Sequence, residues 1–234
     1  MQSTSSNRHL IVGIIGVTVL IFAGLVFAII KAPSDTPSGS VDEKLSFQDQ
    51  EDPAQGPKDA NVVVRVFEDF QCPACRLAEG GFHYALEKYK DRVKFIWNDF
   101  PLTSIHPQAR LGANAARCAE DQGKFWEYHD LLYAKQMEWV KESNPKSFFI
   151  DYATSLGINK ETFTACVNVQ AEDRKVLNDL EEGNRNNVNA TPTVFINNHR
   201  YFAMTPAEWD VAIELAIKNA GSTSTNAQVT STQK

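Results

Sequence analysis

The longest uncharged stretch of the chain covers residues 10–30, 21 positions without Lys, Arg, Asp or Glu. As an α-helix rising about 1.5 Å per residue, this stretch would span roughly 30 Å, the thickness of a bilayer core. A cleaved signal peptide is the alternative, because Val26-Phe27-Ala28 offers a small-residue cleavage site, although the apolar run exceeds most signal cores. We expect an uncleaved anchor at 10–30 after a short cytoplasmic N-terminus at 1–9, with the remaining chain on the extracytoplasmic side of the cell membrane.

The rest of the chain divides by composition into a tether, a domain and a tail. Residues 31–58 contain four prolines, many acidic side chains and few large apolar ones, which is typical of a flexible acidic tether. Residues 59–220 suffice for one domain with its own core. Residues 221–234 are rich in Ser, Thr, Asn and Gln and are predicted to be disordered. The net charge of −6 argues against nucleic-acid binding, which needs a basic surface.

Hydrophobic periodicity predicts an α/β fold that is interrupted by a helical block. Strands are predicted where β-branched and aromatic residues form short apolar runs, and helices where apolar residues recur on one helical face. The predicted strands are 62–67, 93–97, 193–196 and 200–202, and the flanking helices are 72–89 and 206–219. Only helices are predicted within 107–182. The order is β-α-β, then a helical insertion at about 105–182, then β-β-α.

Cys72-Pro73-Ala74-Cys75 follows the first predicted strand and begins the first predicted helix. Backbone N–H groups and the helix dipole stabilise a thiolate at this position, so a low pKa is expected for Cys72. Pro73 suits the first helical position, which needs no N–H donor. The spacing brings Cys75 within reach of Cys72, and a disulfide that releases a low-pKa thiolate is readily attacked. The motif predicts a redox-active pair, in preference to an inert bridge or half of a zinc site.

The other two cysteines, Cys118 and Cys166, do not complete a zinc site with this pair. A structural zinc site needs four ligands, commonly from a second close pair, whereas these cysteines are 48 positions apart with no His beside either. We therefore expect no metal and no cofactor. Both cysteines fall on apolar faces of predicted helices, so a disulfide clamping the insertion is the simplest interpretation in an oxidising compartment. Two buried free thiols and a second redox relay are the alternatives.

Four segments taken in order resemble the DsbA-like thiol–disulfide oxidoreductases, a branch of the thioredoxin superfamily. The first contains the cysteine pair, the second leads into the insertion, and the third resembles the next helix of the insertion. The fourth resembles the cis-proline loop and the strand that follows it. The segments are Phe67-Glu68-Asp69-Phe70-Gln71-Cys72-Pro73-Ala74-Cys75, 98–102 with Ile105-His106-Pro107, 122–132, and Ala190-Thr191-Pro192-Thr193-Val194-Phe195-Ile196-Asn197.

The resemblance implies a thioredoxin fold with an inserted helical domain, preceded here by a single N-terminal transmembrane helix. It implies that Cys72 attacks substrate and forms the mixed disulfide, with Cys75 as its more buried partner. Thr191 and Pro192 would form the substrate-binding loop opposite the pair, with a cis bond before Pro192. An extended substrate could then pair with the backbone of Thr191 in the manner of a strand.

Four further positions are compared with the same branch. Cys118 and Cys166 look placed for the second disulfide that many members carry. Many relatives have a buried Glu six residues before the first active-site cysteine as proton acceptor for the second, and here that position is Val66. An Asp at the position of Asp69 is common in relatives, which suggests a role in the site. The alternative interpretation is a carboxylate that is simply solvated at the end of the strand. The proton route for Cys75 therefore stays open.

These features predict a membrane-anchored, extracytoplasmic enzyme that donates the Cys72–Cys75 disulfide to folding secreted proteins with free thiols. The resemblance implies a quinone-linked membrane partner for reoxidation, either DsbB-like or VKOR-like. No dimerisation segment is visible, so we expect a monomer rather than a DsbC-like isomerase. The same chemistry run as a reductase or isomerase is the first alternative, and a noncatalytic thioredoxin-like binding module is the second.

Overall fold

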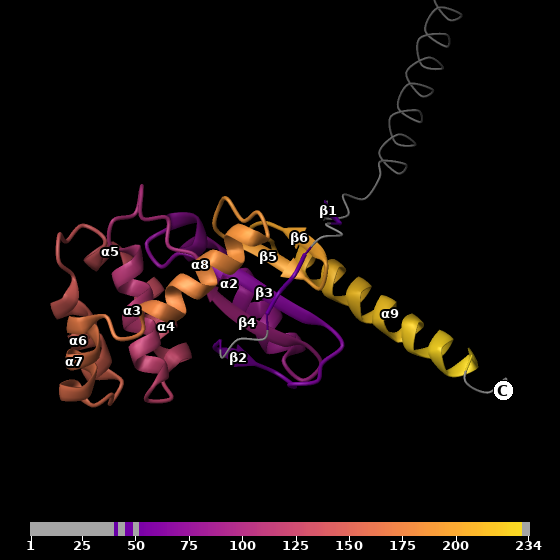
Figure 1. Ribbon diagram of the computed structural model, residues 1–234, viewed down its shortest axis with the longest axis horizontal. Coiled ribbons are helices and arrows are strands. Elements are labelled where there is room, and N and C mark those ends of the chain that lie inside the picture. Colours follow the sequence, from indigo (N-terminus) through magenta and orange to yellow (C-terminus); the bar gives the residue numbers. More distant parts are fainter. Residues whose placement is uncertain (1–39, 42–44, 49–51, 231–234) are drawn as a thin grey trace, which may run out of the picture. The chain divides into compact units, whose positions relative to one another are not determined.

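A mixed β-sheet forms the centre of the protein (Figure 1). The computed structural model describes residues 40–41, 45–48 and 52–230. Within these residues, six strands are ordered β1-β6-β5-β3-β4-β2. Strands β3 and β4 are parallel, with Val63 opposite Lys94, and the other neighbours are antiparallel. The strands are β1 (Ser40–Val41), β2 (Ala54–Gln55), β3 (Val63–Glu68), β4 (Lys94–Asp99), β5 (Thr193–Ile196) and β6 (His199–Tyr201).

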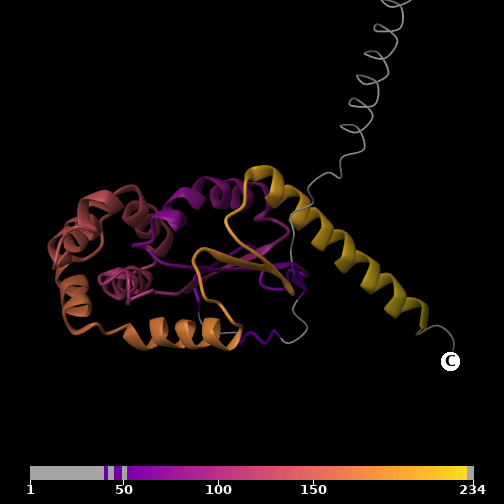
Figure 2. The ribbon, with the colours of Figure 1, turned by 90° about the horizontal axis from the view of Figure 1, so that it is seen from above.

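Helices cover both faces of the sheet, which explains why β3 is apolar and almost continuously buried. Helix α2 (Pro73–Tyr89) and the start of α9 (Pro206–Thr230) lie on one face, and α8 (Asp173–Arg185) lies on the other (Figure 2). Because successive side chains of a strand point to opposite faces, Val64 and Val66 join the larger apolar core, whereas Phe67 joins a smaller cluster with Phe100 and Phe195. Glu68 lies on the side of Val66, the side covered by α2.

The remaining described helices gather at one end of the sheet (Figure 1). They are α3 (Ala109–Glu120), α4 (Phe125–Ala134), α5 (Gln136–Trp139), α6 (Lys146–Ser155) and α7 (Lys160–Val169). Residues 100–192, which the structure describes throughout, contain no strand, as the sequence predicted. Helices α4 and α5 are separated by Lys135.

The predicted extent of the insertion, about 105–182, is wrong at its C-terminal end. Helix α8 packs against β4 and covers the sheet. A Cβ at Gly183 would lie 2.6 Å from the ring of Phe100, so only glycine allows this close approach. The insertion therefore comprises α3–α7, and α8 returns the chain to the sheet.

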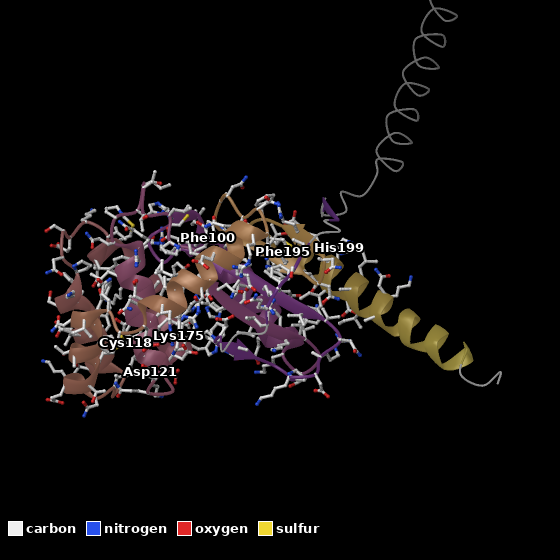
Figure 3. All side chains as sticks on the ribbon, in the orientation of Figure 1. Phe100, Cys118, Asp121, Lys175, Phe195 and His199 are labelled. Atoms are coloured by element: carbon white, nitrogen blue, oxygen red, sulfur yellow. A yellow bond between two sulfur atoms is a disulfide. The ribbon has the colours of Figure 1, made fainter. Side chains whose placement is uncertain are left out.

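A disulfide joins Cys118 of α3 to Cys166 of α7, 48 positions further along the chain (Figure 3). Removing it with Cys118→Ala and Cys166→Ala together is expected to lower the free energy of unfolding by about 2–4 kcal/mol, because the unfolded chain regains the entropy of an open loop. Urea unfolding of the double variant and the oxidised wild type measures the difference. Equal unfolding midpoints would contradict this stabilising role.

The prediction of a flexible tether over 31–58 is wrong for the part that the structure describes. Strand β1 pairs with β6 and β2 pairs with β4, so both segments add to the sheet. The ring of Phe47 lies 5.1 Å from that of Phe195, and Asp52 forms an ion pair with Arg117. Strand pairing, the Phe47 ring and the Asp52 carboxylate help to bind the described part of this segment to the domain despite its polar composition.

The structure describes most of the predicted disordered tail but not the predicted N-terminal anchor. Helix α9 continues to Thr230, so it passes through much of the segment predicted to be disordered. It contains no proline after Pro206, and a helix already started on the sheet extends at small cost per residue. The predicted anchor at 10–30 lies outside the described residues. Among the helices that are described, none has the length and apolar character needed to cross a bilayer.

Candidate active site

The cysteine pair lies at the start of α2, immediately after the central strand. Cys72 is the N-cap residue and Pro73 occupies the first helical turn, as the sequence predicted. The amide of Cys72 donates a hydrogen bond to the carbonyl of Asp69 over 2.9 Å, which turns the chain from β3 into the helix. Cys72 is 7% exposed and Cys75 is fully buried, and the two are not joined by a disulfide in this structure. The outer sulfur is therefore the one that an incoming thiol meets first.

The two thiols have opposite pKa shifts. The pKa of Cys72 is lowered from 9.0 to about 5, chiefly by the hydrogen bond from Cys75, with contributions from Thr191 and the backbone N–H groups of Cys75 and Ala74 that outweigh partial burial. Burial raises the pKa of Cys75 well above its ordinary value, and the nearby Glu68 carboxylate raises it further. At neutral pH, Cys72 is a thiolate and Cys75 keeps its proton, so their chemical roles differ.

The low pKa of Cys72 predicts a pH dependence for the reduced protein. Because the folded-state pKa lies below the unfolded value, ionisation of Cys72 stabilises the reduced fold above the unfolded pKa near 9, and this stabilisation is lost as pH falls through about 5. Ultraviolet absorbance of the thiolate is expected to titrate with a midpoint near pH 5. The Cys72→Ser variant should lack this transition, and a midpoint near pH 9 in the wild type would contradict the assignment.

The loop before β5 closes the site opposite the cysteine pair. The Thr191–Pro192 peptide bond is cis, as the resemblance implied. The Sγ atom of Cys72 lies 3.6 Å from the carbonyl oxygen of Thr191. The hydroxyl of Thr193 donates to the carbonyl of Ala190 over 2.7 Å and braces the turn. The backbone of Thr191 is thus held beside the reactive sulfur.

Asp69 is buried, so its interpretation as a solvated strand-end carboxylate is wrong. One oxygen accepts from the backbone N–H of Gln71 over 2.7 Å. The other accepts from the N–H of Leu102 over 2.9 Å and lies 2.7 Å from Nδ1 of His106. Asp69 fastens the cysteine turn to the segment that leads into α3. Its contribution to the site is positional, because these contacts are all to neighbouring loops.

A buried carboxylate does lie near Cys75, but it comes from Glu68 rather than from position 66. Glu68 is 2% exposed and accepts a hydrogen bond from the hydroxyl of Tyr133 over 2.8 Å. Burial, followed by the charge of Glu79, raises the pKa of Glu68 well above its ordinary value. The alternation of side chains along the strand places Glu68 on the same side as Val66. This alternation was the sequence signal that could have identified Glu68 as the buried carboxylate. Its partners Tyr133 and Glu79 belong to elements distant in sequence and could not be identified.

Gln136 is a second residue of the site that sequence reasoning missed. Its amide nitrogen donates to the carbonyls of Phe70 and Cys72 over 2.9 and 3.0 Å, and its oxygen accepts from Arg76 over 3.1 Å. The break at Lys135 directs this side chain of α5 toward the cysteine turn. The helical block thereby contacts the reactive loop directly.

Comparison with known proteins identifies the class to which this arrangement belongs. Thioredoxin-like proteins share an α/β fold with a mixed sheet, and the sequence model of the Thioredoxin family matches residues 48–215. The chain therefore belongs to this family. Its solved structural neighbours are DsbA-like thiol–disulfide oxidoreductases, which confirms the resemblance found in the sequence.

Two solved structures and one curated relative illustrate the similarity. Oxidised BdbD from Bacillus subtilis is 25% identical, with a TM-score of 0.60 over 80% of this chain and 100% of that chain. The alpha-DsbA1 protein of Wolbachia pipientis is 19% identical, with a TM-score of 0.65 over 73% of this chain and 92% of that one, and supports the fold alone. A protein of Salinispora tropica named Na(+)/H(+) antiporter NhaA 3 is 33% identical over 70% of this chain. The chain spans about a quarter (24%) of that relative's length.

Proposed function

We propose that this protein donates the Cys72–Cys75 disulfide to folding secreted proteins with free thiols. The observation that carries the proposal is the contrast between an N-cap thiol of pKa about 5 and a buried partner whose pKa is raised. A disulfide whose reduction yields a stabilised thiolate is a strong oxidant, because its reduced form is favoured. The cis-proline loop beside Cys72 supports binding of an extended client chain.

The proposed reaction transfers two electrons from the client to the enzyme. A client thiolate attacks Sγ of Cys72, the Cys72–Cys75 bond breaks, and the electron pair passes to Cys75. Cys75 takes a proton, for which Glu68 is the nearby buried donor. A second client thiolate then attacks the client sulfur of the mixed disulfide and releases Cys72 as a thiolate. The products are an oxidised client and a reduced enzyme.

The involvement of Glu68 yields a specific prediction. In Glu68→Gln, exchange through Cys75 is expected to slow by about 10²-fold, because the buried thiolate loses its proton donor. Stopped-flow tryptophan fluorescence during reduction by a dithiol peptide gives the rate. Glu120→Gln is the control, since Glu120 lies on α3 and pairs with Arg117. A rate in Glu68→Gln equal to that of this control would argue against the proton transfer.

Donation in this direction needs an external oxidant and a suitable compartment. We propose that residues 10–30 anchor the enzyme as a monomer with its catalytic domain outside the cytoplasm. A quinone-linked, DsbB-like or VKOR-like membrane protein would accept the electrons. The uncharged character of 10–30 supports the anchor, and the Cys118–Cys166 disulfide suits an oxidising compartment. Protease treatment of intact cells, which should cleave the domain without lysis, tests this orientation.

The reduction potential tests the direction of the chemistry. Equilibration of the purified protein with glutathione redox buffers is expected to give a potential less negative than about −200 mV, the region of oxidising family members. A more negative value would favour the reductase alternative. Complete inactivity toward dithiols would favour the noncatalytic binding module.

A further inference from the structure

A buried tyrosine of the helical block lies against the strand that leads into the cysteine turn. Tyr133, near the C-terminal end of α4, is only 3% exposed. Its hydroxyl donates to a carboxylate oxygen of Glu68 over 2.8 Å and lies 3.3 Å from the carbonyl oxygen of Asp69. The rings of Phe70 and Trp97 pack around the tyrosine ring, at centroid distances of 5.2 and 6.3 Å. The hydroxyl is therefore held between two acceptors on consecutive residues.

The hydroxyl of Tyr133 has one hydrogen to donate, so it cannot serve both acceptors at the same time. The shorter of the two distances identifies the Glu68 oxygen as the acceptor in this structure. Burial raises the pKa of Tyr133 well above its ordinary value, and the charge of Glu68 raises it further, so the hydroxyl keeps its proton at neutral pH. Tyr133 is therefore a hydrogen-bond donor at this site rather than an acid.

Protonation of Glu68 reverses the direction of this hydrogen bond. A protonated carboxyl is itself a donor and can donate to the phenolic oxygen, which has acceptor lone pairs of its own. The hydrogen of Tyr133 can then turn to the carbonyl of Asp69, which accepts from the amide of Cys72 over 2.9 Å and has a second lone pair. Both the hydroxyl and the carboxyl keep a partner in either state, as buried polar groups require.

We propose that Tyr133 is a positioning residue that donates to Glu68 when this side chain is ionised and to the Asp69 carbonyl when it is protonated, and thereby sets the pH range in which Glu68 can supply a proton to Cys75. This role rests on the proton transfer from Glu68 proposed above. The hydrogen bond from Tyr133 stabilises the ionised carboxylate, so it lowers the pKa of Glu68 against the opposing effects of burial and of the charge of Glu79. Without the hydroxyl, Glu68 would hold its proton more tightly.

Other ionisable groups face Glu68 and Tyr133 from neighbouring elements, and all of them persist when only the hydroxyl is removed. They are Glu79, Cys72 and Cys75 on α2 or at its cap, His129 on α4, and Asp99 on β4, which pairs with Arg117. The Tyr133→Phe substitution keeps the buried ring and its aromatic neighbours. A change in the titration of Glu68 in this variant therefore reports the lost hydrogen bond.

Infrared difference spectroscopy of the full chain, with the Cys72–Cys75 pair oxidised so that neither thiol titrates, measures the protonation of Glu68 directly. The carbonyl stretch that disappears in Glu68→Gln belongs to the protonated Glu68 carboxyl, and its intensity is followed against pH. In Tyr133→Phe the midpoint is expected to rise by about one pH unit or more, the shift that corresponds to one hydrogen bond to a charged group.

Tyr128→Phe is the matched control for this titration. Tyr128 is a fully buried tyrosine of the same helix, and its hydroxyl donates to the carbonyl of Phe149 over 3.0 Å. Its removal also costs one buried hydrogen bond, but it should leave the midpoint of the Glu68 band unchanged. A Glu79→Gln background, which removes the neighbouring carboxyl, should show the same rise between tyrosine and phenylalanine at position 133.

The pH dependence of exchange gives a second measurement. The rate of reduction by a dithiol peptide, divided by the concentration of peptide thiolate, is expected to fall at a pH about one unit higher in Tyr133→Phe than in the wild type, because Glu68 keeps its proton to a higher pH. In the Glu68→Gln background, Tyr133→Phe should cause no such shift.

The infrared titration decides the role of Tyr133 independently of catalysis. An unchanged midpoint in Tyr133→Phe, an equal shift in Tyr128→Phe, or a Glu68 band that does not titrate in the wild type would each overturn the proposal. A wild-type protein that oxidises no dithiol would count against the proposed function, and the infrared midpoints would still show whether Tyr133 controls the protonation of Glu68.

Discussion

Cys72→Ser is expected to lower the rate of thiol–disulfide exchange by at least about 10³-fold, because it removes the group that forms the mixed disulfide. Cys75 cannot replace it, since Cys75 is fully buried and its pKa is raised by burial. Oxidation of a fluorescent dithiol peptide by the preoxidised enzyme measures the rate. The variant has no active-site disulfide to donate, so its residual signal should equal that of buffer.

Two further variants make this result specific to Cys72. Cys75→Ser keeps the low-pKa environment of the N-cap, and it is expected to accumulate a mixed disulfide with oxidised glutathione, detectable by mass spectrometry. The double variant Cys118→Ala with Cys166→Ala should exchange at the wild-type rate, because that bridge lies within the helical block. If Cys72→Ser oxidised the peptide as the wild type does, the reactive sulfur would have to be sought elsewhere.

Arg117→Leu is expected to lower the free energy of unfolding by about 3–5 kcal/mol, the cost of leaving buried charges without their partner. The Arg117 side chain is fully buried and lies 2.6 Å from Asp99 and 2.5 Å from Asp179. Asp52 and Glu120 are also within ion-pair distance. Without the guanidinium, these carboxylates repel one another in a buried setting. Urea unfolding at neutral pH measures the loss.

The same variant has a predicted pH dependence and a matched control. Burial already raises the pKa of Asp179 well above its ordinary value. A raised folded-state pKa stabilises the fold below the unfolded pKa and loses this effect as pH rises, so the deficit of Arg117→Leu should shrink toward pH 4. Arg110→Leu, on the same helix but paired with Asp173 at a partly exposed position, should cost under about 1 kcal/mol. Equal losses in the two variants would contradict the buried-cluster interpretation.

Local patterns were enough to predict the elements that carry the cysteines. The β-branched run of β3, proline after Cys72 and the apolar face of α2 each act within a few residues, so the sequence alone indicates strand, turn and helix. The family resemblance added the cis bond before Pro192 and the Cys118–Cys166 pair. The strand, turn and helix are determined largely by the nearby sequence, whereas the disulfide joins residues 48 positions apart.

The contacts that determine the protonation of the site depend on distant elements. Burial and the charge of Glu79 on α2 raise the pKa of Glu68, whereas the hydrogen bond from Tyr133 on α4 lowers it. The burial of Asp69 depends on Leu102 and His106. The docking of residues 45–48 depends on the aromatic cluster that receives Phe47. None of these pairings leaves a periodic signal within one segment, so they could not be predicted from the sequence. For the segment at 31–58, tertiary contacts override the flexible tether that its composition predicted.

The two-residue strands β1 and β2 have a consequence for the function proposed above. An open sheet edge offers unpaired amides and carbonyls to any extended polypeptide, and promotes aggregation. Here β1 covers β6, while β2 covers β4 and the amide of Trp97 donates to the carbonyl of Pro53 over 2.9 Å. The edges of β6 and β4 are therefore paired at these positions, and only the two-residue strands β1 and β2 lie outermost. Under the function proposed above, this arrangement favours pairing of a client backbone at the cis-proline loop beside Cys72.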